Sequence, residues 1–301
     1  MWLQLKEIKL IMSNSISLII PTLNAGSEID NLLNLLSAQS VVPEEILIVD
    51  SASDDKTVSL VQKHEDVRII GINRKDFNHG LTRDMALRES TGDIVCFMTQ
   101  DAVPANNKYV ENLVAPILTD NEVAISSGRQ LPKSDARRFE QLVRAFNYTE
   151  TPYIRSKEDV SRLGIKTYFA TDVCAAYRRS QYLELGGFGK TNMSEDMLMA
   201  AKAINAGYKV AYAADAEVYH SHNLTLKEQY RRNYAIGVFL ETNKDVVKCE
   251  SEVGEGSKLV KSVSESLISE GNITELFAFG FDCAARLLGN RAGRRSARRT
   301  E

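Results

Sequence analysis

The sequence predicts an α/β protein built around a single, mostly parallel central sheet with helices on both faces. Four short apolar runs have the continuous hydrophobic character of strands buried on both faces: Ile16–Ile20, Ile46–Val49, Val67–Gly71 and Asp93–Met98. Helical patterns separate these runs, and strands that alternate with helices at this spacing pair in parallel. The chain of 301 residues is 44% apolar and 26% charged, which is typical of a globular protein with a sizeable core.

The helices are predicted from amphipathic periodicity and from residues typical of helix starts. After Ser27, a plausible N-cap, apolar residues predicted to form the core face of a helix follow at Ile29, Leu32, Leu33, Leu35 and Leu36. Further helices are expected over 57–64, from Gly80 onward, and over 135–148, 195–205 and 225–240. Short strands are expected over 122–127 and 208–213. The strict alternation of strand and helix fades after about residue 120, so the second half of the sheet is less well defined.

The end of the chain differs from the rest in composition. A polar, glycine-containing segment over 248–257 predicts a linker, and two helices are expected after it, the second an amphipathic helix over 273–288. Residues 286–301, here called the basic tail, carry six arginines and one acid, whereas the other 285 residues sum to −8. We therefore expect a domain over 13–245 and a helical C-terminal extension over 258–301.

Composition excludes several classes of protein. The acidic body does not suggest nucleic-acid binding, and the basic tail suggests contact with an anionic surface. The four cysteines lie far apart, without the spacing of a zinc or redox site. No apolar run approaches the ~18–20 residues needed to span a bilayer, and the N-terminus makes a poor signal peptide. We expect a cytoplasmic protein.

Polar side chains follow the predicted strands where ligands bind in such sheets. Asp50 ends the second strand and Asp101 follows the fourth. A strand-end carboxylate can bond a ribose or nucleobase, or bind a hard cation, although a single one is more often a loop acid that caps a helix. The neighbouring polar residues are Thr22, Asn24, Ser51, Ser53 and Asp54.

Three further groups are candidate functional residues. Asn78-His79-Gly80 opens a helix between basic residues, which suits an anion, while a solvated capped helix explains it equally well. Glu195 and Asp196 lie in the first turn of a helix, where acids are favoured by the helix dipole and where one could also act as a general base. His220 and His222 share one face of an extended segment and could ligate a divalent metal.

The segment 186–191 (GGFGKT) ends like a phosphate loop, but it lacks the first glycine and the preceding strand of one. We therefore do not expect a phosphate loop there.

Taken in order, these residues resemble an inverting family 2 glycosyltransferase of the GT-A fold. The matches run from about residue 15 to 240: 21–24 (PTLN), Asp50 with 51–54, 78–80 (NHG) with Arg83, 99–101 (TQD), 186–188 (GGF), 195–196 (ED), and the histidine segment before an arginine-bearing helix. The forms DFNHG, TQDA and HSH are most similar to the rhamnosyltransferase branch, which uses dTDP-L-rhamnose.

The resemblance implies a role for each group. The nucleotide sugar would be bound by Pro21, Thr22, Asn24, Asp50, Ser51, Ser53, His79, Gly80, Arg83, Gln100, Asp101, Arg231 and Arg232. Asp196 would be the catalytic base, with Glu195 beside it. Mg²⁺ or Mn²⁺ would be held by Asp101 with His220 or His222, because Thr99 replaces the first acid of the family's D-x-D motif. Asn233 stands where processive members carry Trp, which argues against a processive polymerase.

The resemblance thus predicts transfer of one sugar, L-rhamnose, to a hydroxyl of a glycan or polyprenyl-diphosphate-linked acceptor in bacterial surface polysaccharide synthesis. If the acceptor is lipid-linked, the enzyme would work at the inner face of the plasma membrane, and the amphipathic segment 273–288 with the basic tail would dock it peripherally. A helix packed on the catalytic domain, followed by a disordered basic end, explains the same segment equally well. The alternatives are another donor, such as UDP-hexose or UDP-galactofuranose, and a non-catalytic glycan-binding subunit with the same fold.

Overall fold

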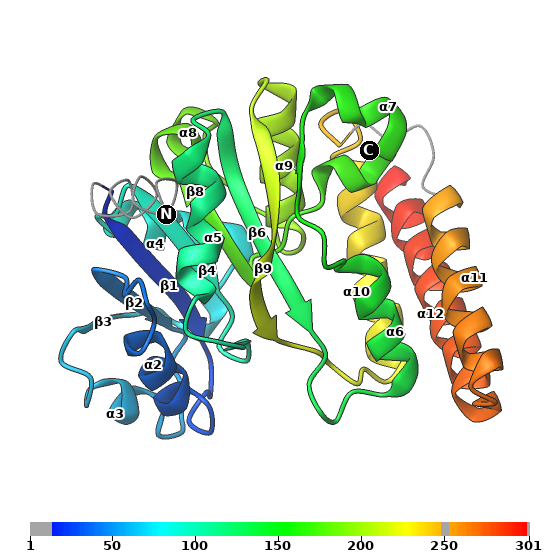
Figure 1. The fold of residues 1–301 in the computed structure, drawn as a ribbon, viewed down its shortest axis with the longest axis horizontal. Coiled ribbons are helices and arrows are strands. Elements are labelled where there is room, and N and C mark those ends of the chain that lie inside the picture. Colours follow the sequence, from blue (N-terminus) through cyan, green and yellow to red (C-terminus); the bar gives the residue numbers. More distant parts are fainter. Residues whose placement is uncertain (1–13, 248–252, 300–301) are drawn as a thin grey trace, which may run out of the picture.

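The computed structural model describes residues 14–247 and 253–299. Within them one sheet of nine strands runs in the order β3-β2-β1-β4-β8-β6-β9-β5, with β7 paired to the first part of β9. The α/β prediction is confirmed: the helices cover both faces of this sheet (Figure 1). The strands are β1 (Ile16–Thr22), β2 (Glu45–Asp50), β3 (Val67–Gly71), β4 (Ile94–Met98), β5 (Val103–Pro104), β6 (Val123–Leu131), β7 (Tyr153–Arg155), β8 (Cys174–Arg178) and β9 (Lys209–Tyr219).

The first four strands pair in parallel, as their apolar runs predicted. β1 and β4 are buried almost throughout, because helices cover both of their faces. Antiparallel pairing enters where the alternation of strand and helix fades: β8 runs antiparallel to both β4 and β6. In the parallel half of the sheet, the residues 22–24, 50–53 and 99–101 therefore lie together at the carboxyl ends of β1, β2 and β4.

The helices form two apolar layers, one on each face of the sheet. They are α2 (Ile29–Ser37), α3 (Thr57–Val61), α4 (His79–Glu89), α5 (Tyr109–Thr119), α6 (Arg138–Asn147), α7 (Val160–Leu163), α8 (Arg179–Glu184), α9 (Glu195–Asn205), α10 (Leu226–Thr242), α11 (Val253–Ser269) and α12 (Ile273–Arg298). Short 3₁₀ turns cover Arg74–Asp76, Lys157–Asp159 and Gly164–Tyr168. The N-cap predicted at Ser27 is instead Glu28, with no side-chain cap bond.

The C-terminal extension packs against the rest of the protein. In Figure 1 α6, α10, α11 and α12 stand together at one end of the sheet, opposite α2 and α3. Phe139 and Val143 of α6 pack with Val263 and Leu267 of α11 and with Phe279 of α12. The helix α12 continues to Arg298, so the basic tail is helical over most of its length. Of the expected linker, 248–252 lies outside the described residues and 253–257 is helical.

Glycines let α10 and α12 approach until their backbones touch. A Cβ added to Gly293 would lie 2.0 Å from the carbonyl oxygen of Tyr234, and one added to Gly289 would lie 2.4 Å from that of Tyr230. On the facing helix, a Cβ on Gly237 would lie 2.2 Å from the carbonyl oxygen of Asn290. Small residues spaced by four allow this close contact because they lie on one face of a helix.

Candidate active site

At the nucleotide end of the sheet, the buried carboxylate of Asp50 organises the loops after β1 and β2. Its oxygens accept hydrogen bonds from the Thr22 hydroxyl (3.0 Å), the Ser53 hydroxyl (2.6 Å) and the Ser53 backbone N–H (2.9 Å). The Ser53 hydroxyl also accepts from the backbone N–H of Asn24 at 2.8 Å. These bonds hold Asn24 in the left-handed backbone region, which Asn tolerates better than most residues.

The other candidate residues of this edge support the same loops. Ser51 is buried, and its backbone N–H donates to the carbonyl of Thr22 at 2.9 Å, while Pro21 lies within β1. The Gln100 side chain bonds both the N–H and the carbonyl of Leu23, at 2.8 and 3.1 Å. The structure therefore brings the predicted nucleotide residues of β1, β2 and β4 together at one edge.

The start of α4 is packed against the loop over 186–191. Asn78 caps the helix by accepting from the Leu81 N–H at 3.0 Å. Gly80 must lack a side chain, because an added Cβ would lie 2.1 Å from the carbonyl oxygen of Gly189. The Asp84 carboxylate accepts from the N–H groups of Phe188 (3.0 Å) and Gly189 (2.9 Å). The Asp84 carboxylate thus fixes the loop over 186–191 against α4.

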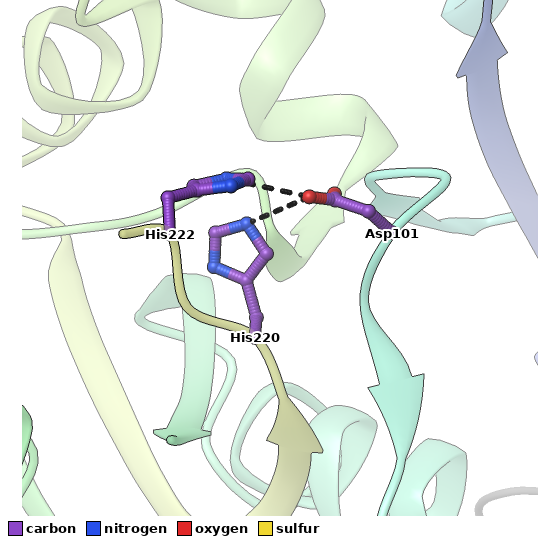
Figure 2. A group of neighbouring side chains, drawn as sticks. All are labelled: Asp101, His220 and His222. Carbon is purple, nitrogen blue, oxygen red and sulfur yellow. Dashed lines mark ion pairs between the residues drawn. The ribbon is translucent and has the colours of Figure 1, made fainter. Parts of the chain in front are cut away.

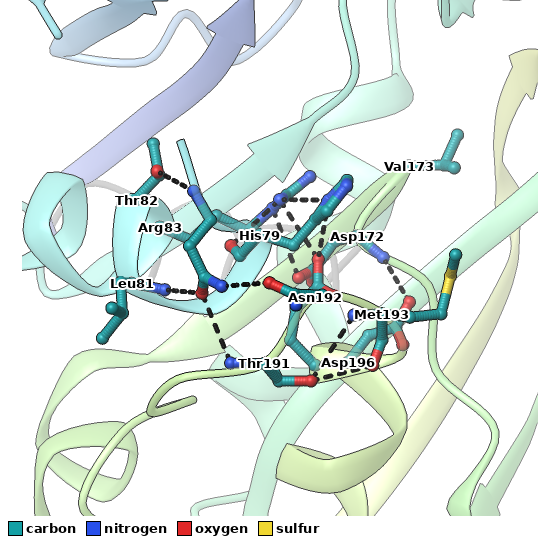
Figure 3. Close-up of polar contacts among 12 residues, drawn as sticks. His79, Leu81, Thr82, Arg83, Asp172, Val173, Thr191, Asn192, Met193 and Asp196 are labelled. Carbon is teal, nitrogen blue, oxygen red and sulfur yellow. Dashed lines mark hydrogen bonds and ion pairs between the residues drawn. The ribbon is translucent and has the colours of Figure 1, made fainter. Parts of the chain in front are cut away.

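Arg83 is buried and lies near His79 and Asp172 (Figure 3). Its guanidinium contacts Glu195 at 3.1 Å and Asp172 at 3.5 Å. His79 is half-buried and lies 3.7 Å from the same Glu195 carboxylate. Burial lowers the pKa of His79, against the attraction of Glu195. The sequence placed Arg83 and Glu195 among the ligand-binding and catalytic residues, but the structure joins them to each other and to Asp172.

The carboxylate of Asp196 lies beside this group. Its oxygens accept from the backbone N–H of Met197 at 2.7 Å and from that of Asp172 at 3.2 Å. Burial, reinforced by the negative charge of Glu195, raises the pKa of Asp196 to about 7. A carboxyl group with a pKa near the working pH suits general base catalysis, because it is partly ionised yet binds a proton well.

Asp101, His220 and His222 converge from different parts of the chain (Figure 2). The Asp101 carboxylate lies 3.4 Å from the Nε2 atom of His220 and 3.3 Å from that of His222. The three ligand atoms lie within 4.8 Å of one another, so they could hold one divalent metal ion. Gln130 contacts Nδ1 of His220 at 2.8 Å, the outer contact that usually orients a metal-ligating histidine.

The ionisation of this group suits a metal. Burial lowers the pKa of His220 and His222, so both imidazoles are neutral near pH 7. Burial alone would raise the pKa of Asp101, but hydrogen bonds from His220 and Thr99 help to hold it below its usual value. Neutral imidazole and ionised carboxylate are the protonation states that metal binding requires.

A cavity of about 310 Å³ opens between Asp196, the histidines and the helices α6, α10 and α12. Both arginines predicted on α10 are exposed, and of the two Arg232 lines this cavity whereas Arg231 does not. Sequence reasoning missed Arg144 of α6 and Arg286 of α12, which also line it. It also missed Asp172, for which the sequence offers no signal, since it precedes β8 in a segment without clear periodicity.

Comparison with known proteins identifies the family. The sequence profile described as Glycosyl transferase family 2 matches residues 17–186. The O-antigen chain rhamnosyltransferase RfbN of Salmonella typhimurium is 43% identical over 84% of this chain and 81% of its own length. The chain belongs to glycosyl transferase family 2. It is a glycosyltransferase, as the resemblance predicted.

Other relatives and solved structures agree. The O-antigen chain rhamnosyltransferase WbaN of Salmonella anatum is 41% identical over 84% of this chain and 81% of its own length. The mannosyltransferase PcManGT of Pyrobaculum calidifontis, solved with GDP-Man and Mn²⁺, superposes with a TM-score of 0.64 at 18% identity, covering 93% of this chain and 87% of that one. Glucosyl-3-phosphoglycerate synthase of Mycobacterium tuberculosis superposes with a TM-score of 0.57 at 16% identity, covering 82% and 84%. These structures support the GT-A fold.

Among the described residues no helix has the length and apolar character to cross a bilayer.

Proposed function

We propose that this glycosyltransferase moves L-rhamnose from dTDP-L-rhamnose to a hydroxyl of a lipid-linked glycan acceptor during O-antigen synthesis, with inversion at the anomeric carbon. The similarity to two O-antigen chain rhamnosyltransferases over 84% of the chain supports the sugar and the pathway. The observation that carries the chemistry is the position of Asp196, a carboxylate with a raised pKa on the wall of a cavity that His220 and His222 also line.

Asp196 acts as the general base. The acceptor hydroxyl enters the cavity, gives its proton to the Asp196 carboxylate and attacks the anomeric carbon from the face opposite the nucleotide. The bond between that carbon and the diphosphate oxygen breaks, and dTDP leaves with the bonding electrons. The N–H groups of Met197 and Asp172 hold the carboxylate in place. Glu195 is a positioning residue, since its carboxylate is turned to Arg83 and its charge raises the pKa of Asp196. No second carboxylate nucleophile is needed, in contrast to retaining hydrolysis.

Asp101, His220 and His222 hold Mn²⁺ in preference to Mg²⁺. One carboxylate oxygen and two imidazole nitrogens fit Mn²⁺, whereas Mg²⁺ prefers an all-oxygen shell with several waters. When bound, the ion neutralises negative charge on the leaving diphosphate. The base and ribose of the nucleotide are bound at the edge formed by Thr22, Asn24, Asp50 and Ser53, with Asp50 both shaping the loops and accepting from the ligand.

A donor screen with a transfer assay tests this proposal. dTDP-L-rhamnose, UDP-glucose and UDP-galactofuranose are compared by thermal shift with Mn²⁺ or Mg²⁺, and then by transfer to the lipid-linked acceptor. We expect dTDP-L-rhamnose with Mn²⁺ to raise the Tm most, because a ligand of the native state stabilises it. A larger shift and faster transfer with a UDP-sugar would contradict the donor, and binding without any transfer would favour a glycan-binding subunit.

The exposed face of α12 docks on the inner leaflet of the membrane where the lipid-linked acceptor lies. Ile273, Phe277, Phe281 and Leu288 are 52–66% exposed and fall on one side of the helix. Arg291 and Arg295 continue the same side and are exposed. Arg294 is turned inward, 23% exposed, against the buried Glu241, whereas Arg298 contacts the same carboxylate and stays 63% exposed. An apolar stripe followed by arginines suits an anionic bilayer surface.

Flotation with vesicles containing anionic lipid tests the docking. The double variant Phe277→Ser/Phe281→Ser should lose flotation while its Tm stays near that of the wild type, since both rings are exposed. The matched control Leu183→Ser changes an exposed apolar residue of α8. Equal flotation of all three proteins would disprove docking through this face.

A further inference from the structure

Three arginines from three helices line the cavity beside Asp196. They are Arg144 of α6, Arg232 of α10 and Arg286 of α12. The last of them lies a hundred residues beyond the end of the family match at residue 186. The C-terminal extension therefore contributes a charged side chain to the active-site cavity.

Two of these arginines are held by carboxylates and the third is not. Nε of Arg144 donates to Glu140 at 2.9 Å, and Nε of Arg286 donates to Asp282 at 2.6 Å. Asp282 is itself buried and accepts from the Gln229 amide at 2.8 Å. Within the described part of the chain, Arg232 forms no hydrogen bond or ion pair. All three side chains line the same cavity, and desolvation, followed by the like charges of Arg144 and Arg286, lowers the pKa of Arg232.

The cluster is also joined to the metal group. Gln130 bonds the guanidinium of Arg144 and, with the same oxygen, contacts Nδ1 of His220. An anion bound by the arginines would therefore lie in the same cavity as Asp196, on the side of α6, α10 and α12. Guanidinium groups bind phosphate oxygens in bidentate fashion, and two of the three are already oriented by their carboxylates, which reduces the entropy lost on binding.

We propose that Arg144, Arg232 and Arg286 form a subsite for a diphosphate group, completed by the C-terminal helix α12. This inference deepens the proposed function and rests on it for its setting. The diphosphate has two sources in that reaction: the nucleotide that leaves the donor, and the diphosphate that links the acceptor glycan to its lipid. In either case α12 takes part in ligand recognition as well as in folding.

Calorimetric titration of the full-length protein with inorganic pyrophosphate in EDTA tests the subsite without the metal. The main variant is Asp282→Asn/Arg286→Gln, which removes the buried pair together and leaves no unpaired carboxylate. We expect its pyrophosphate Kd to rise by about 10- to 100-fold, the effect of losing a charge-assisted hydrogen bond. Arg232→Gln should weaken binding similarly without disturbing the fold, because Arg232 is exposed and has no hydrogen-bond or ion-pair partner within 14–247 and 253–299. The control Lys227→Gln removes an exposed charge from α10 and should bind like the wild type.

Competition then identifies the source of the diphosphate. Displacement of pyrophosphate by dTDP, but not by farnesyl diphosphate, assigns the subsite to the donor; displacement by farnesyl diphosphate while dTDP and Mn²⁺ are saturating assigns it to the acceptor. No pyrophosphate binding by the wild type, or equal binding by the Arg232 and Arg286 variants, overturns the proposal. These readouts do not depend on which sugar is transferred, so a failed donor screen would leave them interpretable.

Discussion

The two ends of the sheet hold their functional side chains in different ways. At the nucleotide end, the loops after the parallel strands β1 and β2 are bonded to each other: Asp50 accepts three hydrogen bonds from Thr22 and Ser53. At the cavity end, side chains from separate helices meet around an open volume, and Arg232 has no partner among the described residues. The first region is preorganised by local sequence, whereas the second is assembled by helix packing. At the nucleotide end, substitutions should therefore change binding by disordering the loops. At the cavity end, they should change binding by shifting the position of α12.

The largest effect is expected at the junction of the two regions. Asp196→Asn removes the base, so kcat should fall by about 10²- to 10⁴-fold while donor binding is retained. Single-turnover transfer assays and donor titrations measure the two quantities separately. The exposed Asp215→Asn serves as the control. Full activity of the Asp196 variant would show that another group takes the proton.

Helix packing at the cavity end can be broken at one glycine. Gly293→Ala forces a methyl group against the Tyr234 carbonyl oxygen, 2.0 Å from the added Cβ, and should lower the free energy of unfolding by about 1–3 kcal/mol. On the same helix, a Cβ on Gly280 meets nothing within 4 Å, so Gly280→Ala should stabilise the protein by about 0.5–1 kcal/mol. Chemical denaturation distinguishes the opposite signs, and equal effects would contradict close packing of α10 and α12.

Asp50→Asn tests the nucleotide end. The amide keeps one acceptor but presents an NH₂ group to donors of the loop, so the Kd for dTDP should rise about tenfold. The control is Asp54→Asn, which changes an exposed acid of the same loop. If the Kd changed equally in both variants, the loop charge would matter more than the bonds of Asp50.

The rate and the stability should both change with pH. Because the pKa of Asp196 is raised to about 7, kcat should fall about tenfold per pH unit well below that value. The native state also holds this proton more tightly than the unfolded chain, so stability decreases as pH rises from the usual carboxyl range through about 7. Asp196→Asn should remove that decrease, which denaturation at pH 5.5 and 8 would reveal.

Sequence reasoning succeeded where geometry follows from local rules. Parallel strands bring their carboxyl ends to one edge, so Thr22 and Asp50 had to meet, and the i, i+2 spacing of His220 and His222 put both on one face. It could not place Arg83 near Asp172, because Asp172 precedes β8 in a segment without clear periodicity. Nor could it bring Arg144 and Arg286 into one cavity, since that depends on how three helices pack. The spacing of Gly289 and Gly293 was the one available signal, because two small residues four apart predict a close helix contact.

The close contact between α10 and α12 determines where Arg286 lies in the ligand site. Gly289 and Gly293 leave no room for α12 to slide by a turn, about 5.4 Å, without driving a side chain into the backbone of α10. The reach of Arg286 into the cavity is thereby set by glycines one and two turns further along the same helix. A C-terminal helix transplanted from a relative would keep this register only if it brought both glycines with it, whatever residue it carried in place of Arg286.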